Sequence, residues 1–236
     1  MKSIIVSVEG NIGSGKSTFL KNLEKKFGSG SPTKFVFVQE PVSEWTKVKD
    51  DNGVDMLSKF YADQEKYSFA FQMMAYISRL SLLKRAYQEN PTDAIIITER
   101  SVHTDRYVFA KMLYDDKKIE DVEYKIYLKW FDEFIEELPI SSIVYLHTTP
   151  EISHQRLQKR AREGEGTVPL EYLKNCYKYH EDWLNNEKSV VRVLDVSGEN
   201  NEENNLKWEQ EFMEFLAATI WVWMNLNSTL SVAIAH

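Results

Sequence analysis

A glycine-rich segment near the start of the sequence has the spacing of a loop that binds nucleotide phosphates, G-x-x-x-x-G-K-[ST]. It consists of Gly10, Asn11, Ile12, Gly13, Ser14, Gly15, Lys16, Ser17 and Thr18. The glycines let backbone N–H groups surround phosphate oxygens, and the following helix presents its positive end to them. Lys16 can reach the β- and γ-phosphates, while Ser17 offers its hydroxyl to Mg²⁺. The sequence therefore predicts a site for a nucleoside triphosphate.

Two carboxylates and an arginine follow later apolar segments and are candidates for catalysis. Glu40 is costly at the end of a buried strand without a function or a partner. It either accepts a proton from a substrate hydroxyl or forms a strand-end ion pair. Glu99 and Arg100 either order Mg²⁺ and orient a phosphate, respectively, or pair with each other. Spacing alone leaves these alternatives open.

Three arginines, Arg156, Arg160 and Arg162, precede the glycine-containing segment Glu163-Gly164-Glu165-Gly166. Arg156 and Arg160 share a helix face because they are four residues apart. Such a cluster suits a mobile lid that closes positive charge over a phosphoryl group during its transfer. The alternative is a charged helix face exposed to solvent.

The elements that must position these residues are indicated by five short apolar runs, separated by segments with helical spacing. The runs are Ile4–Val8, Phe35–Val38, Ala94–Thr98, Ile143–Leu146 and Val190–Leu194. Runs without polar alternation are typical of strands buried on both faces, and hence of a parallel sheet covered by helices. We therefore predict a doubly wound α/β fold that binds its ligand beyond the carboxyl ends of the strands.

One helical segment has a clear apolar stripe with helical spacing. The stripe consists of Val122, Ile126, Trp130, Phe131, Phe134, Ile135 and Leu138. We expect its aromatic part, Trp130, Phe131 and Phe134, to face the sheet, and the alternative is that this part contributes to a helical dimer interface.

Length and composition define the setting of this fold. The chain has 236 residues, for which we expect one domain at 1–216 and a hydrophobic tail at 217–236. The net charge of −7 argues against a broad nucleic-acid-binding surface. The apolar stretch Phe215–Met224 is too short to span a membrane. With a single cysteine and no visible targeting segment, we expect a cytoplasmic protein that binds neither nucleic acid nor membranes.

Together these segments resemble the deoxynucleoside kinases, the family of deoxycytidine, deoxyguanosine and mitochondrial-type thymidine kinases. The resemblance extends from Ile4 to about Asp195. Besides the phosphate loop and the three arginines, it is carried by Glu40-Pro41-Val42 with Trp45, Phe71-Gln72, Glu99-Arg100-Ser101, Asp105-Arg106-Tyr107, Pro169-Leu170-Glu171-Tyr172-Leu173 and His180-Glu181-Asp182-Trp183. It implies a P-loop kinase fold with a five-stranded parallel sheet, flanking helices and an Arg-rich lid.

The resemblance also implies an activity in nucleotide salvage and a role for each candidate residue. The γ-phosphate of ATP or another nucleoside triphosphate, with Mg²⁺ held at Ser17 and Glu99, would pass to the 5′-hydroxyl of a deoxynucleoside. Lys16 would contact the phosphates and Glu40 would be the general base. Arg100 would hold the 5′-hydroxyl and the incoming phosphate, and the lid arginines would stabilise the phosphoryl group. The expected substrate-binding residues are Glu40, Trp45, Tyr61, Phe71, Gln72, Ala75, Arg79, Arg100, Asp105, Phe109 and Glu165.

Specific positions within this set suggest which base is preferred. Tyr61 and Glu165 would bind the sugar 3′-hydroxyl, whereas Ala75, Arg79 and Asp105 match the deoxycytidine kinase pattern. Thymidine-accepting relatives carry apolar groups at the last two positions. A carboxylate suits an exocyclic amine and opposes a thymine carbonyl, and an unpaired buried polar group costs about 1–3 kcal/mol. We expect a preference for deoxycytidine and deoxypurines over thymidine.

The sequence departs from the family pattern in two places, and two other functional interpretations compete with that of a deoxynucleoside kinase. Ser197-Gly198-Glu199-Asn200 lacks the aromatic residue that relatives place after the fifth strand to stack on the donor base, so the donor preference stays open. The tail Ala217–His236 has no family counterpart, although family members are mostly homodimers. The alternatives are a nucleoside monophosphate kinase of the thymidylate kinase type and a non-catalytic accessory subunit of the same fold.

Overall fold

The computed structural model describes residues 2–28, 31, 33–135, 138–160 and 168–233, with the backbone alone from residue 224 onward. Five parallel strands form one sheet in the order β2-β3-β1-β4-β5. They are β1 (Ile4–Glu9), β2 (Lys34–Val38), β3 (Ala94–Glu99), β4 (Ser142–His147) and β5 (Val190–Asp195). Each predicted run is thus confirmed to within one residue at either end. The fold class predicted from the sequence is confirmed as well.

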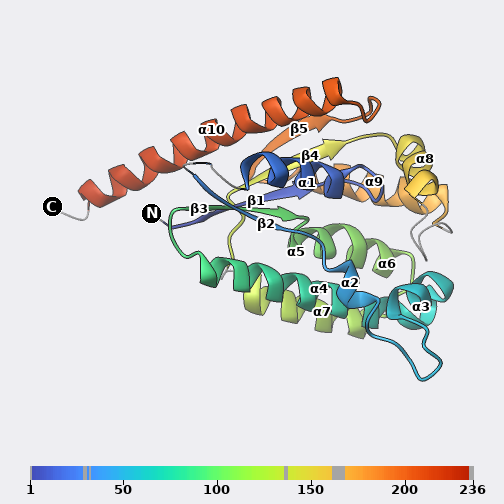
Figure 1. Ribbon diagram of the computed structural model, residues 1–236. Coiled ribbons are helices and arrows are strands. Elements are labelled where there is room, and N and C mark those ends of the chain that lie inside the picture. Colours follow the sequence, from blue (N-terminus) through green and yellow to red (C-terminus); the bar gives the residue numbers. More distant parts are fainter. Residues whose placement is uncertain (1, 29–30, 32, 136–137, 161–167, 234–236) are drawn as a thin grey trace.

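Helices connect the strands and cover both faces of the sheet (Figure 1). In chain order they are α1 (Lys16–Phe27), α2 (Val42–Trp45), α3 (Met56–Ala62), α4 (Gln64–Glu89), α5 (Val102–Thr104), the π-helical segment η1 (Asp105–Ala110), α6 (Lys111–Asp115), α7 (Asp121–Phe134), α8 (Pro150–Arg160), α9 (Leu170–Leu184) and α10 (Glu202–Ala233). Helix α10 runs without a break through residue 217, where the sequence suggested a boundary between domain and tail.

Strand alternation separates two hydrophobic cores. On β1, Ile4, Val6 and Val8 pack with side chains of α1 and α10, whereas Ile5 packs with α4 on the opposite face. Side chains of β4 extend this second face toward α6 and α9. The core strands are therefore buried on both sides, as their unbroken apolar sequences predict.

The edge strands depart from the expectation of complete burial. Val190 and Val193 of β5 are more than half exposed, and β2 is only partly buried. Each of these strands has a neighbour on one side only. A β-branched, apolar composition therefore did not distinguish an edge strand from a central one.

The prediction that the aromatic part of the α7 stripe faces the sheet was wrong. Val122, Ile126 and Trp130 are exposed, with Trp130 at 48%, whereas Phe131 is 1% exposed. The buried face of α7 consists of Tyr127 and Phe131, which pack against Tyr76 of α4. Helix α7 therefore lies on α4 (Figure 1), one layer removed from the sheet.

Candidate active site

The predicted site residues converge on one cavity of about 830 Å³ at the carboxyl edge of the sheet. This is where a parallel sheet places a ligand. The predicted residues that line it are Ile12, Gly13, Ser14, Gly15, Lys16, Ser17, Thr18, Glu40, Trp45, Tyr61, Phe71, Gln72, Ala75, Arg79, Glu99, Arg100, Asp105, Phe109, Arg156 and Arg160. Gly10 and Asn11 support the loop without lining the cavity. Arg162 and Glu165 lie outside the described residues, so their roles stay predictions.

The phosphate loop joins β1 to α1 and is fixed by contacts that require its sequence. Gly13 has a positive φ of 81°, and a Cβ there would lie 2.4 Å from the carbonyl oxygen of Ser153 in α8. The Asn11 amide donates to the carbonyl oxygen of Leu173 in α9 at 2.9 Å. The loop is thereby held against two helices, and its backbone lies close enough to α8 to exclude a side chain at residue 13.

Lys16 is turned back onto its own loop. Its Nζ donates to the carbonyl oxygens of Gly10 and Asn11 at 3.0 and 2.7 Å. Burial, and then the positive charge of Arg100, lower the pKa of Lys16 to about 7. The ammonium group therefore has two backbone acceptors in place of phosphate oxygens.

Ser17 and Glu99 form the pair expected to hold Mg²⁺. Ser17 Oγ donates to Glu99 Oε1 at 2.6 Å, and both residues line the cavity. A hydroxyl and one carboxylate match what Mg²⁺ uses in phosphate sites, where waters and substrate oxygens complete the octahedron. The pair fits the ion. No group of three acidic, His or Cys side chains with metal-binding geometry occurs among the described residues.

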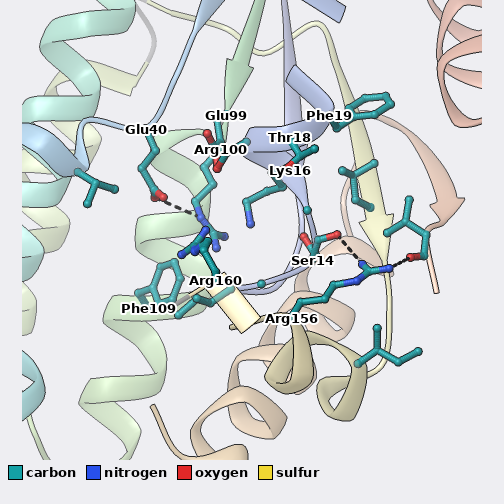
Figure 2. A pocket seen from close by; sticks show the side chains of 18 of the residues that line it. Ser14, Lys16, Thr18, Phe19, Glu40, Glu99, Arg100, Phe109, Arg156 and Arg160 are labelled. Atoms are coloured by element: carbon teal, nitrogen blue, oxygen red, sulfur yellow. Dashed lines mark hydrogen bonds and ion pairs between the residues drawn. The ribbon is translucent and has the colours of Figure 1, made fainter. Parts of the chain in front are cut away.

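Glu40 follows β2 and is bound by two arginines, as Figure 2 shows in part. Its Oε1 lies 2.9 Å from Arg79 Nη2 and 3.3 Å from Arg100 Nε. Burial alone would raise the pKa of Glu40, but Arg79, Arg100 and Lys16 outweigh it and lower that pKa to about 2. The carboxylate is therefore ionised at neutral pH and can accept a proton. Glu40 forms ion pairs with arginines from other elements and also lines the cavity, while its role as a general base stays a prediction.

Arg100 occupies a strained backbone position directly after β3. Its φ is +64°, a left-handed conformation that non-glycine residues rarely adopt. Its N–H donates to the carbonyl oxygen of Val8 at 3.0 Å, and its own carbonyl accepts from Thr98 Oγ1 at 2.8 Å. These bonds hold the strained turn, which directs a buried guanidinium over the Phe109 ring, 5.0 Å from its centroid.

The far end of the cavity has the composition of a pocket for a heterocyclic base. Trp45, Phe71 and Phe109 provide aromatic walls, and Phe71 also stacks on Phe60 with 4.4 Å between centroids. Gln72 is 2% exposed, and its Oε1 has no protein hydrogen-bond partner. A buried amide oxygen that lines a cavity without a partner indicates a ligand that supplies a donor.

Arg79 and Asp105 form the polar corner of this pocket. Arg79 Nε donates to Asp105 Oδ2 at 2.9 Å, Nη2 to Oδ1 at 3.3 Å, and Nη1 to the carbonyl oxygen of Glu99 at 3.2 Å. Asp105 begins the π-helical segment η1, which also carries Phe109. Such π-helical turns are rare and occur frequently at functional sites.

The two described lid arginines both line the cavity, but Arg156 is engaged with the backbone. It donates to the carbonyl oxygens of Ser14, Val196 and Gly198 at 3.0, 2.7 and 2.7 Å. It thereby ties the phosphate loop to the loop after β5 (Figure 2). Contact of Arg156, Arg160 or Arg162 with a phosphoryl group stays a prediction.

Sequence reasoning missed several residues that complete the site. Glu9, at the end of β1, is fully buried and accepts from Ser7 Oγ, from the N–H and Oγ of Ser101, and from Thr104 Oγ1. It locks the segment after Arg100 onto β1.

His180 contacts Arg100 directly. Trp208 of α10 lines the cavity together with residues 196–200. For Glu9, the only signal in the sequence was that Glu9 and Ser101 stand at the ends of adjacent strands.

The site combines a phosphate loop on a parallel sheet with an ionised carboxylate and a buried arginine that face the loop across one cavity. This combination defines a P-loop phosphotransferase. A model of the family "Deoxynucleoside kinase" matches residues 6–220. The chain belongs to the deoxynucleoside kinase family. It is therefore a phosphotransferase that acts on deoxynucleosides with a nucleoside triphosphate as donor.

Individual relatives support this assignment. A probable deoxycytidine kinase of fowlpox virus (strain NVSL) is 38% identical over 200 residues, which cover 82% of this chain and 78% of that protein. Human deoxycytidine kinase is 34% identical over 198 residues, with 76% and 74% covered. Human mitochondrial thymidine kinase 2 is 37% identical over 185 residues, with 78% and 65% covered. All three are named as nucleoside kinases, which favours a nucleoside over a monophosphate as acceptor.

Within the described parts of the chain, no helix combines the length and the apolar character that a membrane span requires.

Proposed function

We propose that the enzyme transfers the γ-phosphate of ATP, with Mg²⁺, to the 5′-hydroxyl of deoxycytidine and deoxypurine nucleosides in preference to thymidine. The observation that supports this most directly is the position of Glu40. Its carboxylate is partly buried and ionised, is bound by Arg79 and Arg100, and lies in the same cavity as Lys16 of the phosphate loop.

In the proposed mechanism each residue has one task. The 5′-oxygen attacks the γ-phosphorus while its proton passes to Glu40, and the bond between the γ-phosphorus and the oxygen bridging to the β-phosphate breaks. Arg100 orients the attacking oxygen, and Lys16 leaves its backbone acceptors to bind the phosphates. Mg²⁺, held through Ser17 and Glu99, would neutralise charge on the β- and γ-oxygens. Glu40 is a weak base because its pKa is about 2, so it takes the proton as the new P–O bond acidifies the hydroxyl.

The base preference follows from the polar corner of the pocket. Asp105 offers only acceptor atoms, and its carboxylate has lone pairs beyond the two that Arg79 uses. An exocyclic amine on cytosine or adenine could donate to it, whereas a thymine carbonyl in its place would face an acceptor. The unpaired Oε1 of Gln72 adds a second acceptor nearby.

Transfer from radiolabelled ATP to the four deoxynucleosides, and to their monophosphates as a comparison, tests the proposal. Glu40→Gln keeps the shape of the side chain but removes the base, and we expect kcat to fall about 10²- to 10⁴-fold. Glu44→Gln, an exposed change on α2, is the matched control. Full activity of Glu40→Gln would refute the role of this carboxylate. A thymidine kcat/KM above those for both deoxycytidine and deoxyadenosine would refute the base preference.

The donor assignment to ATP is supported by the composition of the opposite end of the cavity. Residues 196–200 contribute backbone there, while Phe19 and Trp208 contribute aromatic surface that the loop itself lacks. An aromatic face from α10 would replace the family's loop residue as the wall of the donor base site. Measured kcat/KM values for ATP, GTP and UTP decide the donor preference.

We also propose that the enzyme is a homodimer and works in the cytoplasm. The exposed stripe of Val122, Ile126 and Trp130 on α7, beside exposed Ile77 of α4, supplies an apolar surface for a second copy of the chain. The compartment rests on the single buried, unpaired cysteine, Cys176. Imaging of a fluorescent fusion tests the location, since one of the similar proteins is named as mitochondrial.

A further inference from the structure

A buried histidine contacts the guanidinium of Arg100 at a different nitrogen from the one that contacts Glu40. His180 lies on α9 and is fully buried. Its Nε2 is 3.4 Å from Arg100 Nη1, and its Nδ1 is 2.7 Å from the carbonyl oxygen of Cys176, one helical turn earlier. The proposed mechanism gives this residue no task, yet it is joined directly to the arginine at the reacting centre.

The hydrogen bonds determine the tautomer of His180. A backbone carbonyl only accepts, so Nδ1 must carry the proton that is donated to Cys176. Nε2 is then left with a lone pair, and an arginine N–H is the partner that such a lone pair requires. Burial, together with the positive charges of Arg100 and Lys16, holds the pKa of His180 well below its ordinary value. The imidazole is therefore neutral and able to accept.

The packing of the ring leaves His180 little freedom to turn. It stacks on Tyr145 of β4 with 6.1 Å between centroids and an interplanar angle of 8°, and Phe109 meets it edge-on at 6.5 Å. Phe109 also lies under the Arg100 guanidinium. Arg100 is thus held at three points: Glu40 at Nε, His180 at Nη1 and the Phe109 ring at its face.

We propose that His180 is a positioning residue for catalysis, which fixes the orientation of the Arg100 guanidinium toward the 5′-hydroxyl. The inference rests on the proposed role of Arg100 in the reaction. Without an acceptor at Nε2, a buried arginine N–H would lose its partner and the guanidinium could rotate about its long side chain. The loss would affect the transition state more than substrate binding, because the other groups proposed to bind the base, Gln72, Asp105, Trp45 and Phe71, are separate from this contact.

Two polar variants of His180 test the proposal, and both should lower the stability of the fold by a similar amount. Glutamine places an oxygen near the position of Nε2, whereas asparagine is too short and ends near the position of Nδ1. We expect His180→Gln to keep kcat within about threefold of wild type, and His180→Asn to lower it by roughly tenfold or more. The KM values for deoxynucleoside and donor should change by less than about twofold in both variants. His147→Asn, at a histidine that bonds to Tyr177 and not to Arg100, is the control and should retain activity.

A double-mutant cycle separates this inference from the proposed function. If His180 acts through Arg100, then His180→Asn should have no further effect on kcat in an Arg100→Met background. Equal kcat losses for His180→Gln and His180→Asn, or additive losses in the cycle, would overturn the positioning role. Unchanged kcat for Arg100→Met alone would instead refute the role of Arg100 and, with it, the basis of this inference. Melting temperatures of all variants identify any loss that comes from unfolding.

Discussion

At the scale of single residues, Arg79 bonds at the same time to the proposed general base, Glu40, and to the carboxylate proposed to recognise the nucleobase, Asp105. Its guanidinium contacts Glu40, Asp105 and the carbonyl oxygen of Glu99. Arginine suits this position because its fork of donors serves several acceptors and remains charged when buried. The proton affinity of Glu40 and the choice of nucleobase therefore depend on one side chain.

The pH dependence of activity should reveal this link. Removal of the Arg79 charge leaves burial to favour the neutral carboxyl, so the pKa of Glu40 should rise from about 2. We expect the acid limb of kcat/KM for Arg79→Met with Asp105→Ala to lie at least about one pH unit higher than for Asp105→Ala alone. Steady-state rates measured from neutral pH down to the most acidic pH at which both variants remain folded locate the two limbs. Superimposable acid limbs would show that Arg79 does not set the ionisation of Glu40.

The same double variant should change the substrate preference. Without Asp105 and Arg79, the pocket no longer opposes a thymine carbonyl with an acceptor. The ratio of kcat/KM for thymidine to that for deoxycytidine should rise roughly tenfold or more. Asp105→Glu, which keeps an acceptor-only carboxylate at this position, is the control and should show a smaller rise. An unchanged ratio in the double variant would contradict the assignment of Asp105.

Residues of this kind show the limit of prediction from the sequence. The phosphate loop and Glu40 were predictable because short motifs and strand ends determine their place. The contact between Arg100 and His180 was not, because it joins residues 80 positions apart and depends on the packing of α9 against η1. Glu9 was also missed, because a carboxylate satisfied by four donors has no local sequence signature.

At the scale of elements, the phosphate loop depends on how closely α8 approaches it. Gly13 packs its backbone onto Ser153, and Arg156 of the same helix bonds to Ser14. The exposed face of α7 shows the opposite case, in which a regular apolar stripe predicted burial wrongly. Periodicity identifies an apolar face but does not identify what covers it.

A pair of glycine variants separates backbone strain from steric contact. Gly13 and Gly53 both have φ of +81°, but a Cβ at Gly53 would meet nothing within 4 Å. Gly53→Ala should cost about 1 kcal/mol of unfolding free energy from strain alone. Gly13→Ala should cost a further 1–3 kcal/mol, roughly, and should raise KM for the donor, since α8 must move. Urea unfolding and donor kinetics measure both, and equal losses at the two positions would contradict the close approach.

At the scale of the whole molecule, two apolar regions face outward. Helix α10 extends beyond Leu216, the last fully buried residue among its described side chains, and leaves Trp221 68% exposed, while Ile220 and Trp223 still pack on the core. The second region is the α7 stripe beside α4 (Figure 1). The α7 stripe suits a symmetric dimer, because the same patch of one copy can meet itself on another.

Light scattering should detect this dimer and its loss. Trp130→Glu places a charge at the centre of the proposed interface, where it would be desolvated without a partner. We expect the molar mass to fall to that of one chain, about 27.6 kDa. Val48→Glu, which adds the same charge at an exposed residue elsewhere, should leave the mass unchanged. A single-chain mass for the wild type would refute the dimer.

The Lys16 side chain turns back onto its own loop, and this conformation links nucleotide binding to proton uptake. In the free enzyme, burial and then the positive charge of Arg100 lower the pKa of this amine to about 7, although two backbone carbonyls accept its hydrogen bonds. Polyphosphate brings negative charge to the same nitrogen, so its pKa must rise and the complex must take up a fraction of a proton near neutrality. Calorimetric heats of ATP binding should therefore vary with the ionisation enthalpy of the buffer, and affinity should weaken as pH rises above about 7. A buffer-independent enthalpy, with Lys16→Arg as the non-titrating comparison, would show that this nitrogen is already fully charged before the donor arrives.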